Sequence, residues 1–518
     1  MKMRNKTFIA CCVCLLISIS CDEDLLDKVN TNKQTSQTYY KTIDEVSTAV
    51  NGIYAVLQSN NLGGREWFFL HDLRSDEMAT GGGHLETPRN QVLIGTHDAS
   101  NAVLTSVWTG SYRLILRANA VINLAPEAEI AETAVRDRLI GEAKFLRAWQ
   151  YFQLYGFWGA VPIYETFATS LEEAQPRAST EAVKALIVSD LTDAIAVLPE
   201  SYSGNDLGRA SKIAAQALLA KVYMFDAQYA EAKPLLEAVI AAGEAAAGGT
   251  ALMDDYYANF REEAEDEYNL ESIWEISYTA NGNYNWDGDG NDFGANESWI
   301  RSQEYSAVGW RNLIPSDDLL AEFEDGDPRL HFNFYFTGDE YGDPSDPLIL
   351  TDGAQRGNSS IYKGVEQKIS WKKYSVMYKL DPGGYWDQIG INHRVLRYAD
   401  MYLLLAECEN EIGSPALAVE YLNKTRARPS VDMPLYPTAE YPTGSKDQIM
   451  EAIMHERRVE LAGEEIRNFD ILRWRKAGKF TEDPISYFQS NKYELLPIPL
   501  GELDANVMIE QDDQNPGY

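Results

Sequence analysis

Residues 212–241, KIAAQALLAKVYMFDAQYAEAKPLLEAVIA, are the most informative stretch of this 518-residue sequence. Apolar residues recur in it every three or four positions, which is the period of an amphipathic helix. A short turn around residues 226–228 divides the stretch into two helices, 212–225 and 229–241. The stretch therefore predicts a helical hairpin, and we take that hairpin as the building unit of the fold.

A second helical hairpin is predicted at 398–411 and 416–426, with Gly413-Ser414-Pro415 as its turn. Small residues at matching places on both helices permit close packing, as in tetratricopeptide hairpins. The two hairpins lie about 186 residues apart, so we expect separate pieces of one helical scaffold rather than a regular solenoid. Both hairpins place two alanines twelve residues apart: Ala220 and Ala232 in the first, Ala406 and Ala418 in the second.

Further segments with a helical period extend this scaffold on both sides of the first hairpin. The fold class that we predict is all-α: a tetratricopeptide-like helix-pair scaffold with long irregular loop insertions that carry the ligand site. The additional predicted helices are 43–57, 107–124, 132–155, 180–198 and 448–462, with Gly156 expected to end the third of them.

The composition excludes several classes of function. Lys and Arg total 45 against 79 Asp and Glu, and the formal net charge is −34. A chain this acidic is repelled by phosphate backbones, so we expect no nucleic-acid partner. For the same reason, attachment to anionic lipid through a basic patch is not expected. Apolar residues make up 45%, which is enough for a large core.

The N-terminus predicts a secretory signal peptide over residues 1–20. A basic start is followed by the apolar run 7–20, which at 14 residues is too short to cross a membrane. Ser18-Ile19-Ser20-Cys21 resembles a bacterial lipobox, so Cys21 is the expected lipidation site. The acidic residues 22–24 then resemble the surface-export signal of Bacteroidetes-type lipoproteins. An ordinary signal peptide with an incidental cysteine remains the alternative.

Cysteine usage is consistent with a lipidated mature chain that begins at Cys21. Cys11, Cys12 and Cys14 lie within the signal peptide, so Cys408 is the one cysteine left besides Cys21. The mature chain is therefore predicted to form no intramolecular disulfide. We interpret Cys408 as a small buried apolar residue of a helix. The polar residues 21–39 read as a tether between the lipid and the folded body.

Three irregular stretches interrupt the helical pattern, at 281–312, 338–357 and 382–390. They are rich in Gly, Asn, Asp and aromatic residues. Long irregular loops in a structured protein are more often functional than not. Rings that cover the C–H faces of sugars, beside planar polar groups for the hydroxyls, make a glycan the expected ligand.

Taken in order along the chain, these and other segments resemble the SusD/RagB family of outer-membrane nutrient-binding lipoproteins. The most specific are GEAKFLRAWQYFQLYGF at 141–157 and GRASKIAAQALLAKVY at 208–223. The other matching segments are 21–27, 44–54, 73–77, 269–276, 396–407, 456–469, 496–499 and 514–518. The resemblance covers nearly the whole chain.

The resemblance implies an α-helical fold with four tetratricopeptide-like helix pairs and an outward-facing lipid anchor on the outer membrane. It also implies a SusC-like TonB-dependent transporter as partner, to which the bound oligosaccharide is delivered. On this basis we divide the chain into a signal peptide (1–20), a lipidated tether (21–39), an N-terminal SusD-like helical region (40–245) and a C-terminal SusD/RagB region with the ligand loops (246–518). The last two form one intertwined unit.

The candidate ligand-binding residues are aromatic rings and polar groups of these loops and of the family region near residues 67–90. For each ring the alternative is packing of the loop onto the scaffold. For Arg74 and Asp76 it is a structural hydrogen-bonded pair. The candidates are Trp67, Arg74, Asp76, His84, Asn90, Tyr284, Trp286, Asn296, Trp299, Arg301, Tyr305, Trp310 and Trp386, the last of these in a Pro-Gly-Gly loop.

We expect no resident cofactor, although one loop resembles part of a calcium site. Asp287, Asp289 and Asn291 alternate as oxygen ligands do in a calcium loop. Asp292 stands where the turn glycine belongs and Ser298 where the bidentate glutamate belongs, so ordinary solvated carboxylates are the competing interpretation.

The sequence does not indicate an enzyme. It contains no His-Glu-x-x-His, no Gly-x-Ser-x-Gly elbow and no phosphate loop. The charged cluster Glu456-Arg457-Arg458, with Glu460 and Glu464, is interpreted as ion pairs that support the scaffold. The function that we predict is non-catalytic glycan binding at the cell surface. A peptide-binding RagB-like member and a surface glycosidase remain as alternatives, and the glycosidase would need a carboxylate pair at a cleaving distance.

Overall fold

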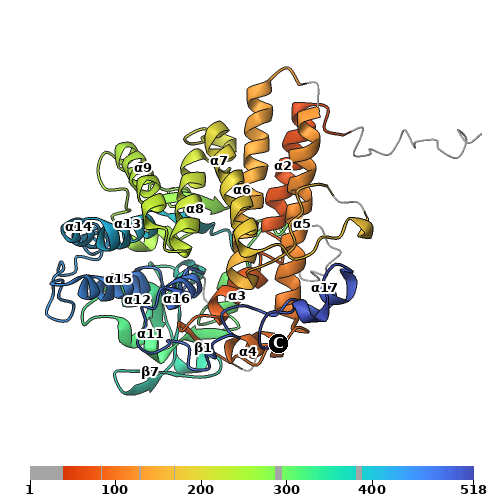
Figure 1. Cartoon of the computed structure of the whole chain (residues 1–518). Coiled ribbons are helices and arrows are strands. Elements are labelled where there is room, and N and C mark those ends of the chain that lie inside the picture. Colours follow the sequence, from red (N-terminus) through yellow and green to blue (C-terminus); the bar gives the residue numbers. More distant parts are fainter. Residues whose placement is uncertain (1–38, 83–84, 128–129, 168–169, 286–294, 381–387) are drawn as a thin grey trace, which may run out of the picture.

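The computed structural model describes residues 39–82, 85–127, 130–167, 170–285, 295–380 and 388–518 (Figure 1). Helices dominate it. They are α2 (Ile43–Leu57), α3 (Glu66–Leu73), α4 (Thr87–Leu93), α5 (Ala102–Leu124), α6 (Thr133–Trp158), α7 (Thr180–Val197), α8 (Lys212–Phe225), α9 (Tyr229–Ala247), α10 (Arg301–Tyr305), α11 (Asp317–Glu322), α12 (Arg329–Asn333), α13 (Tyr398–Ile412), α14 (Pro415–Arg426), α15 (Lys446–Glu460), α16 (Arg467–Lys476) and α17 (Leu500–Ala505).

The strands are short and form antiparallel pairs rather than one sheet. In Figure 1 the labelled strands β1 and β7 lie along the lower edge, below the long helices. The pairs are β1 (Met78–Thr80) with β3 (Leu313–Pro315), β2 (Ser272–Ile276) with β10 (His393–Arg397), β4 (Phe334–Phe336) with β9 (Ile369–Trp371), β5 (Glu340–Tyr341) with β6 (Leu348–Ile349), and β7 (Ser360–Tyr362) with β8 (Val365–Gln367).

The two predicted hairpins are confirmed, and they are neighbours in space. Helix α8 packs on α9 and α13 on α14, while α9 packs directly on α13. Gly243 makes the last of these contacts possible. A Cβ atom there would lie 2.4 Å from the ring of Tyr398, too close for any larger side chain. Segments far apart in sequence therefore form one continuous helical layer (Figure 1).

Local sequence signals explain where several helices begin. Thr42 caps α2: its hydroxyl accepts from Glu45 N at 3.2 Å and its backbone N–H donates to the Glu45 carboxylate at 3.0 Å. This capping box satisfies backbone groups that a helix start leaves open. Ser211 caps α8 in a similar way, through Ala214 N at 3.1 Å.

One predicted helix end is wrong. The helix predicted at 132–155 does not stop at Gly156 but runs on to Trp158 as α6. Gly156 instead serves packing, because a Cβ atom there would lie 2.3 Å from the ring of Phe469 on the segment that forms α16. A glycine inside a helix thus marks a close contact here, and Gly159, with φ of 71°, provides the end.

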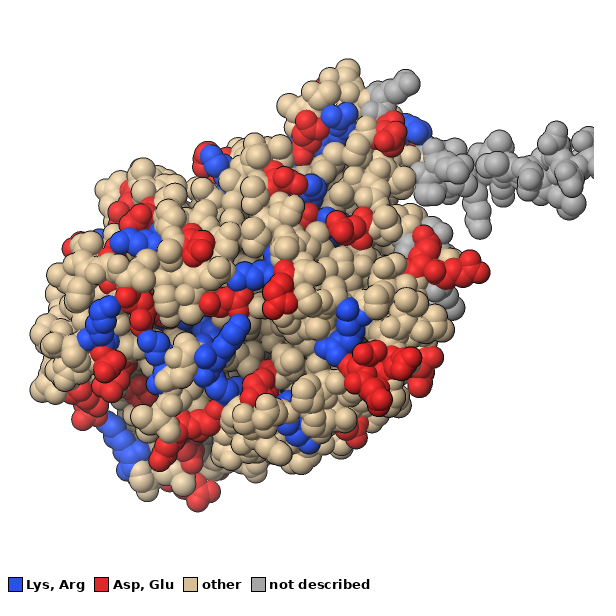
Figure 2. Space-filling view, in the orientation of Figure 1, with Lys and Arg blue, Asp and Glu red and all other residues tan. Residues whose placement is uncertain are grey.

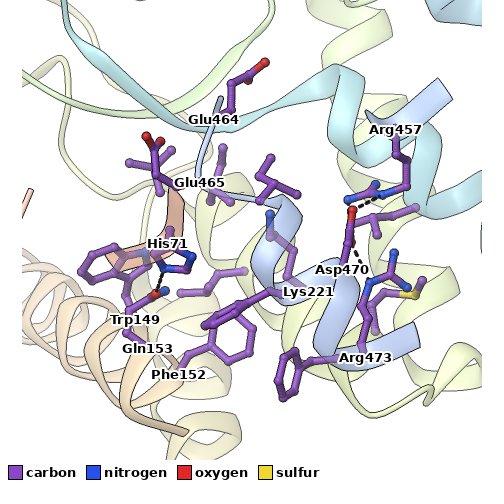
Figure 3. Close-up of a pocket in the computed structure, with 18 of the residues that line it drawn as sticks. His71, Trp149, Phe152, Gln153, Lys221, Arg457, Glu464, Glu465, Asp470 and Arg473 are labelled. Atoms are coloured by element: carbon purple, nitrogen blue, oxygen red, sulfur yellow. Dashed lines mark hydrogen bonds and ion pairs between the residues drawn. The ribbon is translucent and has the colours of Figure 1, made fainter. Parts of the chain in front are cut away.

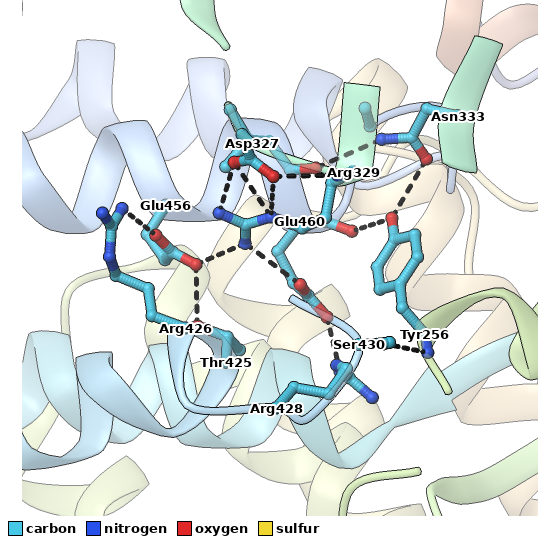
Figure 4. Close-up of polar contacts among 12 residues, drawn as sticks. Tyr256, Asp327, Arg329, Asn333, Thr425, Arg426, Arg428, Ser430, Glu456 and Glu460 are labelled. Atoms are coloured by element: carbon cyan, nitrogen blue, oxygen red, sulfur yellow. Dashed lines mark hydrogen bonds and ion pairs between the residues drawn. The ribbon is translucent and has the colours of Figure 1, made fainter. Parts of the chain in front are cut away.

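The predicted charge cluster is confirmed as a buried ion-pair network (Figure 4). Arg329 reaches both Glu456 and Glu460 of α15, with 3.2 Å to the Glu460 carboxylate. Arg428 bonds the same Glu460 at 2.8 Å, and Arg397 bonds it at 2.9 Å. All of these side chains are at most 1% exposed. The network therefore joins α12, α14 and α15 to the end of β10.

Surface charge follows the acidic composition. Figure 2 shows lysines and arginines interspersed with acidic side chains across the face drawn.

Cys408 is a buried free thiol on α13, and burial raises its pKa, so it has no reactive thiolate. Within the part of the chain that the structure describes, no helix combines the length and the apolarity that a membrane crossing requires.

Candidate functional site

The structure places several predicted ligand residues in the core, and these predictions are corrected. The ring of Trp299 is 0% exposed. It stacks between Tyr278 and His393, with ring centroids 5.3 and 5.0 Å away, and its Nε1 donates to Gly63 O at 3.0 Å. A ring covered on both faces offers no surface for a sugar. Trp299 therefore holds the loop onto the scaffold.

Arg301 and Tyr305 of α10 are buried beside Trp299 and are corrected in the same way. Arg301 pairs with Glu465 and lies 3.2 Å from Asp72, while the Tyr305 hydroxyl donates to Asp72 at 2.8 Å. Burial raises the pKa of Glu465, but the opposing charges of Arg301 and His393 outweigh it and hold the pKa at about 2. These groups form an internal ion cluster.

Trp67, Arg74 and Asp76 are also structural. Trp67 is buried, and its Nε1 donates to Gln153 at 3.0 Å. Arg74 and Asp76 do not form the pair considered from the sequence. Arg74 donates to the Tyr493 carbonyl at 3.0 Å, whereas Asp76 receives two bonds of 2.7 Å from Arg467.

Asn296 and Tyr284 lie at the base of the 281–312 insertion. Asn296 is 0% exposed; its side chain accepts from Asn285 N and donates to Gln58 O, each at 2.8 Å. Asn60 completes the contact by donating to Asn285 O at 2.6 Å. Tyr284 is 7% exposed. Asn296 thus fastens the loop to the segment that precedes α3, and Tyr284 is buried.

Some predictions lie outside the described residues and remain predictions. They are the ligand roles of His84, Trp286 and Trp386, and the calcium ligands Asp287, Asp289 and Asn291. Among the residues that the structure does describe, no group of three or more His, Cys, Asp or Glu side chains is arranged to hold a metal ion.

Two predicted residues, Trp310 and Asn90, do lie at the surface. Trp310 is half-buried and follows the turn after α10. Its neighbour Arg311 adopts a left-handed conformation with φ of 55°. The Arg311 guanidinium fixes this strained turn from below, with bonds of 2.6 Å to Ser370 Oγ and 2.9 Å to Ile369 O. The ring of Trp310 is thereby held in a defined position.

Arg65 lies over the Trp310 ring, with its Cζ 5.7 Å from the ring centroid. Glu304 of α10 orients it: Arg65 Nε donates to Glu304 Oε1 at 2.6 Å. Burial raises the pKa of Glu304, although Arg65 and Arg89 oppose that rise. A second carboxylate, Glu86, lies 3.5 Å from Arg65 and is half exposed. The sequence did not indicate Arg65, because no local pattern links it to Glu304 or Trp310, which are distant from it in the chain.

A polar groove of about 860 Å³ lies along β1 and β3, and helix α4, which follows Glu86, carries Asn90. Thr80 connects the two, since its hydroxyl donates to Asn90 at 3.3 Å and its carbonyl accepts from Asn358 at 2.9 Å. We call Arg65, Glu86, Asn90 and Trp310 together with this groove the Trp310 surface. The groove is lined by Ala79, Thr80, Ile314, Ser316, Asp317, Asp318, Gly357, Asn358, Ser359 and Glu366.

A separate cavity lies inside the molecule, between α3, α6, α8 and α16 (Figure 3). At about 60 Å³ it is too small for a sugar ring. His71 contacts Gln153 there at 2.9 Å, and burial lowers the pKa of His71 to about 4. Lys221 is paired with Asp400 at 2.5 Å. This cavity is a polar pocket of the core and not a ligand entrance.

The fold is a helical scaffold with short strand pairs and irregular segments, and the comparisons identify its class. A profile described as the SusD family matches residues 270–518, and one described as "Starch-binding associating with outer membrane" matches residues 24–224. The chain belongs to the SusD family. The fold prediction is confirmed with it.

Individual relatives span the whole chain. "SusD-like protein P25" of Formosa agariphila is 28% identical over 100% of both chains. A solved "Laminarin binding SusD-like protein" has a TM-score of 0.72 at 26% identity, covering 92% of this chain and 100% of its own. A SusD-like protein of Bacteroides fragilis has a TM-score of 0.75 at 22% identity, covering 93% and 98% of the two chains.

Family membership bears on two further predictions. SusD-like proteins are carbohydrate-binding and non-catalytic, in agreement with the prediction that this chain is not an enzyme. The family is associated with the outer membrane, as predicted, whereas the lipid on Cys21 and the transporter remain to be tested.

Proposed function

We propose that this protein is a cell-surface lipoprotein that binds an oligosaccharide and delivers it to a SusC-like TonB-dependent transporter. Trp310 carries the proposal. It is a partly buried ring at the surface near a polar groove, and a ring together with polar groups is the combination that sugar recognition requires.

The arrangement suits a hydrated, extended ligand. The part of the Trp310 ring that the Arg65 guanidinium leaves uncovered can contact the C–H face of one sugar. The groove offers hydroxyl and amide groups for neighbouring sugars, among them Thr80, Ser316 and Asn358. Few rings are exposed, so affinity is modest and the ligand can be released for transport.

The comparisons support this class of ligand. The laminarin-binding relative is 26% identical and matches this fold over nearly the whole chain. Laminarin is therefore a natural first probe. The peptide-binding alternative lacks such support, and we do not develop it.

The experiment is affinity electrophoresis of residues 22–518 through gels that contain laminarin, starch, galactomannan, alginate or polygalacturonate. We expect at least one glycan to slow the protein without release of reducing sugar. Unchanged migration in every gel would contradict glycan binding. Release of reducing sugar would favour the glycosidase instead.

The anchor and the transporter require a test in cells. We expect the full-length chain to fractionate with the outer membrane and to copurify with a large β-barrel transporter. A Cys21→Ser variant should lose the membrane association while its secreted form still binds glycan. Membrane association that survives this substitution would contradict the lipid anchor.

A further inference from the structure

We infer that the glycan bound at the Trp310 surface is uncharged, and that the surface discriminates against uronate and sulfate groups. The inference rests on the proposed function, because it names the class of glycan that the same site takes. It follows from how the cations and the carboxylates of this surface are paired.

The arginines next to Trp310 are already engaged with carboxylates. Arg65 pairs with Glu304 and Glu86, and Arg89 pairs with Glu66 and the same Glu86. Two guanidinium groups thus face three carboxylates. Recognition of a sulfate or uronate needs a guanidinium with donors directed at the ligand. Here those donors point at the protein.

Arg311 is likewise occupied. Its Nη1 donates to Arg356 O at 2.5 Å and Asn358 O at 2.7 Å, and its Nε donates to Ser370 Oγ at 2.6 Å. The residue is 0% exposed. Its charge supports the turn behind Trp310 and is not available at the surface.

The groove adds exposed acid. Asp318 has a side chain that is 75% exposed, and its partner Arg458 is shared with Asp76 and Glu322. Arg467 also bonds Asp76 and His455 also bonds Glu322, so Asp318 is the exposed carboxylate of this group. Asp317 accepts from the backbone of Ile361 at 2.7 Å, a neutral donor that leaves its charge uncompensated. Glu366 is exposed on β8.

The other cations near the groove do not outnumber its carboxylates. Arg356 is exposed, and Lys368 donates to Gln355 O at 2.6 Å. At a net charge of −34 the long-range potential has the same sign as the carboxylates. Arg356 and Lys368 are two cations against the three groove carboxylates Asp317, Asp318 and Glu366, so a carboxylate or sulfate on a ligand meets a net repulsion, which salt screens.

The test compares glycans that differ only in charge. The chain without its lipidated cysteine, residues 22–518, is titrated with each neutral glycan that slows it in the gel and with the carboxymethylated derivative of that glycan. We expect the derivative to bind at least tenfold more weakly at 20 mM NaCl. The difference should shrink at 500 mM NaCl, where screening is strong.

A matched pair of variants assigns the effect to the groove. Glu366→Lys should narrow the affinity ratio between the neutral glycan and its carboxymethylated form by at least threefold. Glu132→Lys makes the same charge change at the exposed start of α6, at the other end of the molecule, and should leave that ratio unchanged.

The outcomes separate this inference from the proposed function. Equal binding of the carboxymethylated form, or retardation by alginate or polygalacturonate, would overturn the inference and leave glycan binding intact. Equal effects of the two lysine variants would overturn its assignment to the groove. Failure of all neutral and acidic glycans to bind would overturn both.

Discussion

Arg65 and Glu304 form an ion pair of 2.6 Å that joins the segment before α3 to α10, although the two residues lie 239 positions apart. The Glu304 side chain is fully buried and that of Arg65 is 19% exposed. The buried carboxylate therefore fixes a guanidinium whose outer side reaches the surface, 5.7 Å from the Trp310 ring centroid. A buried contact thus determines where Arg65 lies at the proposed ligand face.

The Arg65–Glu304 pair predicts separable effects on folding and binding. Arg65→Met leaves the Glu304 carboxylate short of a partner and should lower the free energy of unfolding by about 3 kcal/mol. Adding Glu304→Gln removes the buried charge and should recover most of that stability. Glycan affinity should stay low in both variants. Full recovery of affinity in the double variant would show that Arg65 acts through stability alone.

Trp299 and Trp310, two of the three tryptophans of the 281–312 stretch, should differ in how much stability their loss costs. Trp299→Ala empties a fully buried site and should cost about 3–5 kcal/mol of stability. Trp310→Ala should cost less, about 1–3 kcal/mol, since its side chain is only partly buried. Urea unfolding measures both. Similar losses would contradict the assignment of one ring to the core and the other to the surface.

The buried network should be sensitive to loss of one carboxylate. Glu460→Ala leaves Arg329, Arg397 and Arg428 short of an acceptor, so we expect a loss of about 3–5 kcal/mol in unfolding experiments. The exposed pair of Lys363 and Asp325 is the matched control. Lys363→Met should change stability by less than about 1 kcal/mol. Similar changes in the free energy of unfolding at the two sites would contradict the prediction that the buried network stabilises the fold more than the exposed pair does.

Glu77 predicts a pH dependence of stability. Burial raises its pKa to about 7, against a smaller lowering by the backbone N–H of Gly463. A carboxyl with a raised pKa favours folding while it is protonated, so its contribution is present below about pH 4.5 and falls as pH rises through 7.

Glu77→Gln removes that titration. Relative to the wild type, the free energy of unfolding of this variant should rise by about 1–3 kcal/mol between pH 5 and pH 8. Chemical unfolding at both pH values measures the difference. A difference that is constant with pH, or that falls, would contradict the raised pKa of Glu77.

The sequence predicted the helical hairpins well because their signal is local. The period of apolar residues in 212–241 depends on neighbours within the same helix, and α8 has the predicted bounds. The end of α6 was less predictable. Gly156 is a helix breaker by local rules, but its contact with Phe469 is tertiary. Only the folded chain distinguishes a packing glycine from a terminating one.

The binding surface was predicted only in part, for the same reason. Trp299 and Trp310 stand in one glycine-rich stretch, and nothing local separates them. Gly63 and His393, which are remote in sequence, bury the first. Trp310 is left at the surface by a turn that Arg311 holds. Aromatic composition thus pointed to this stretch as a candidate region, whereas distant contacts determine which of its rings reaches the surface.

The most direct test of the account is a calorimetric titration of residues 22–518 and of the Trp310→Ala variant with the same oligosaccharide. We expect measurable binding by the wild-type chain and an affinity at least fivefold lower in the variant, equivalent to about 1 kcal/mol of lost stacking. A Trp310→Phe variant should retain most of the affinity. Equal affinity of the wild-type chain and the alanine variant would contradict the assignment of the binding site to the Trp310 surface.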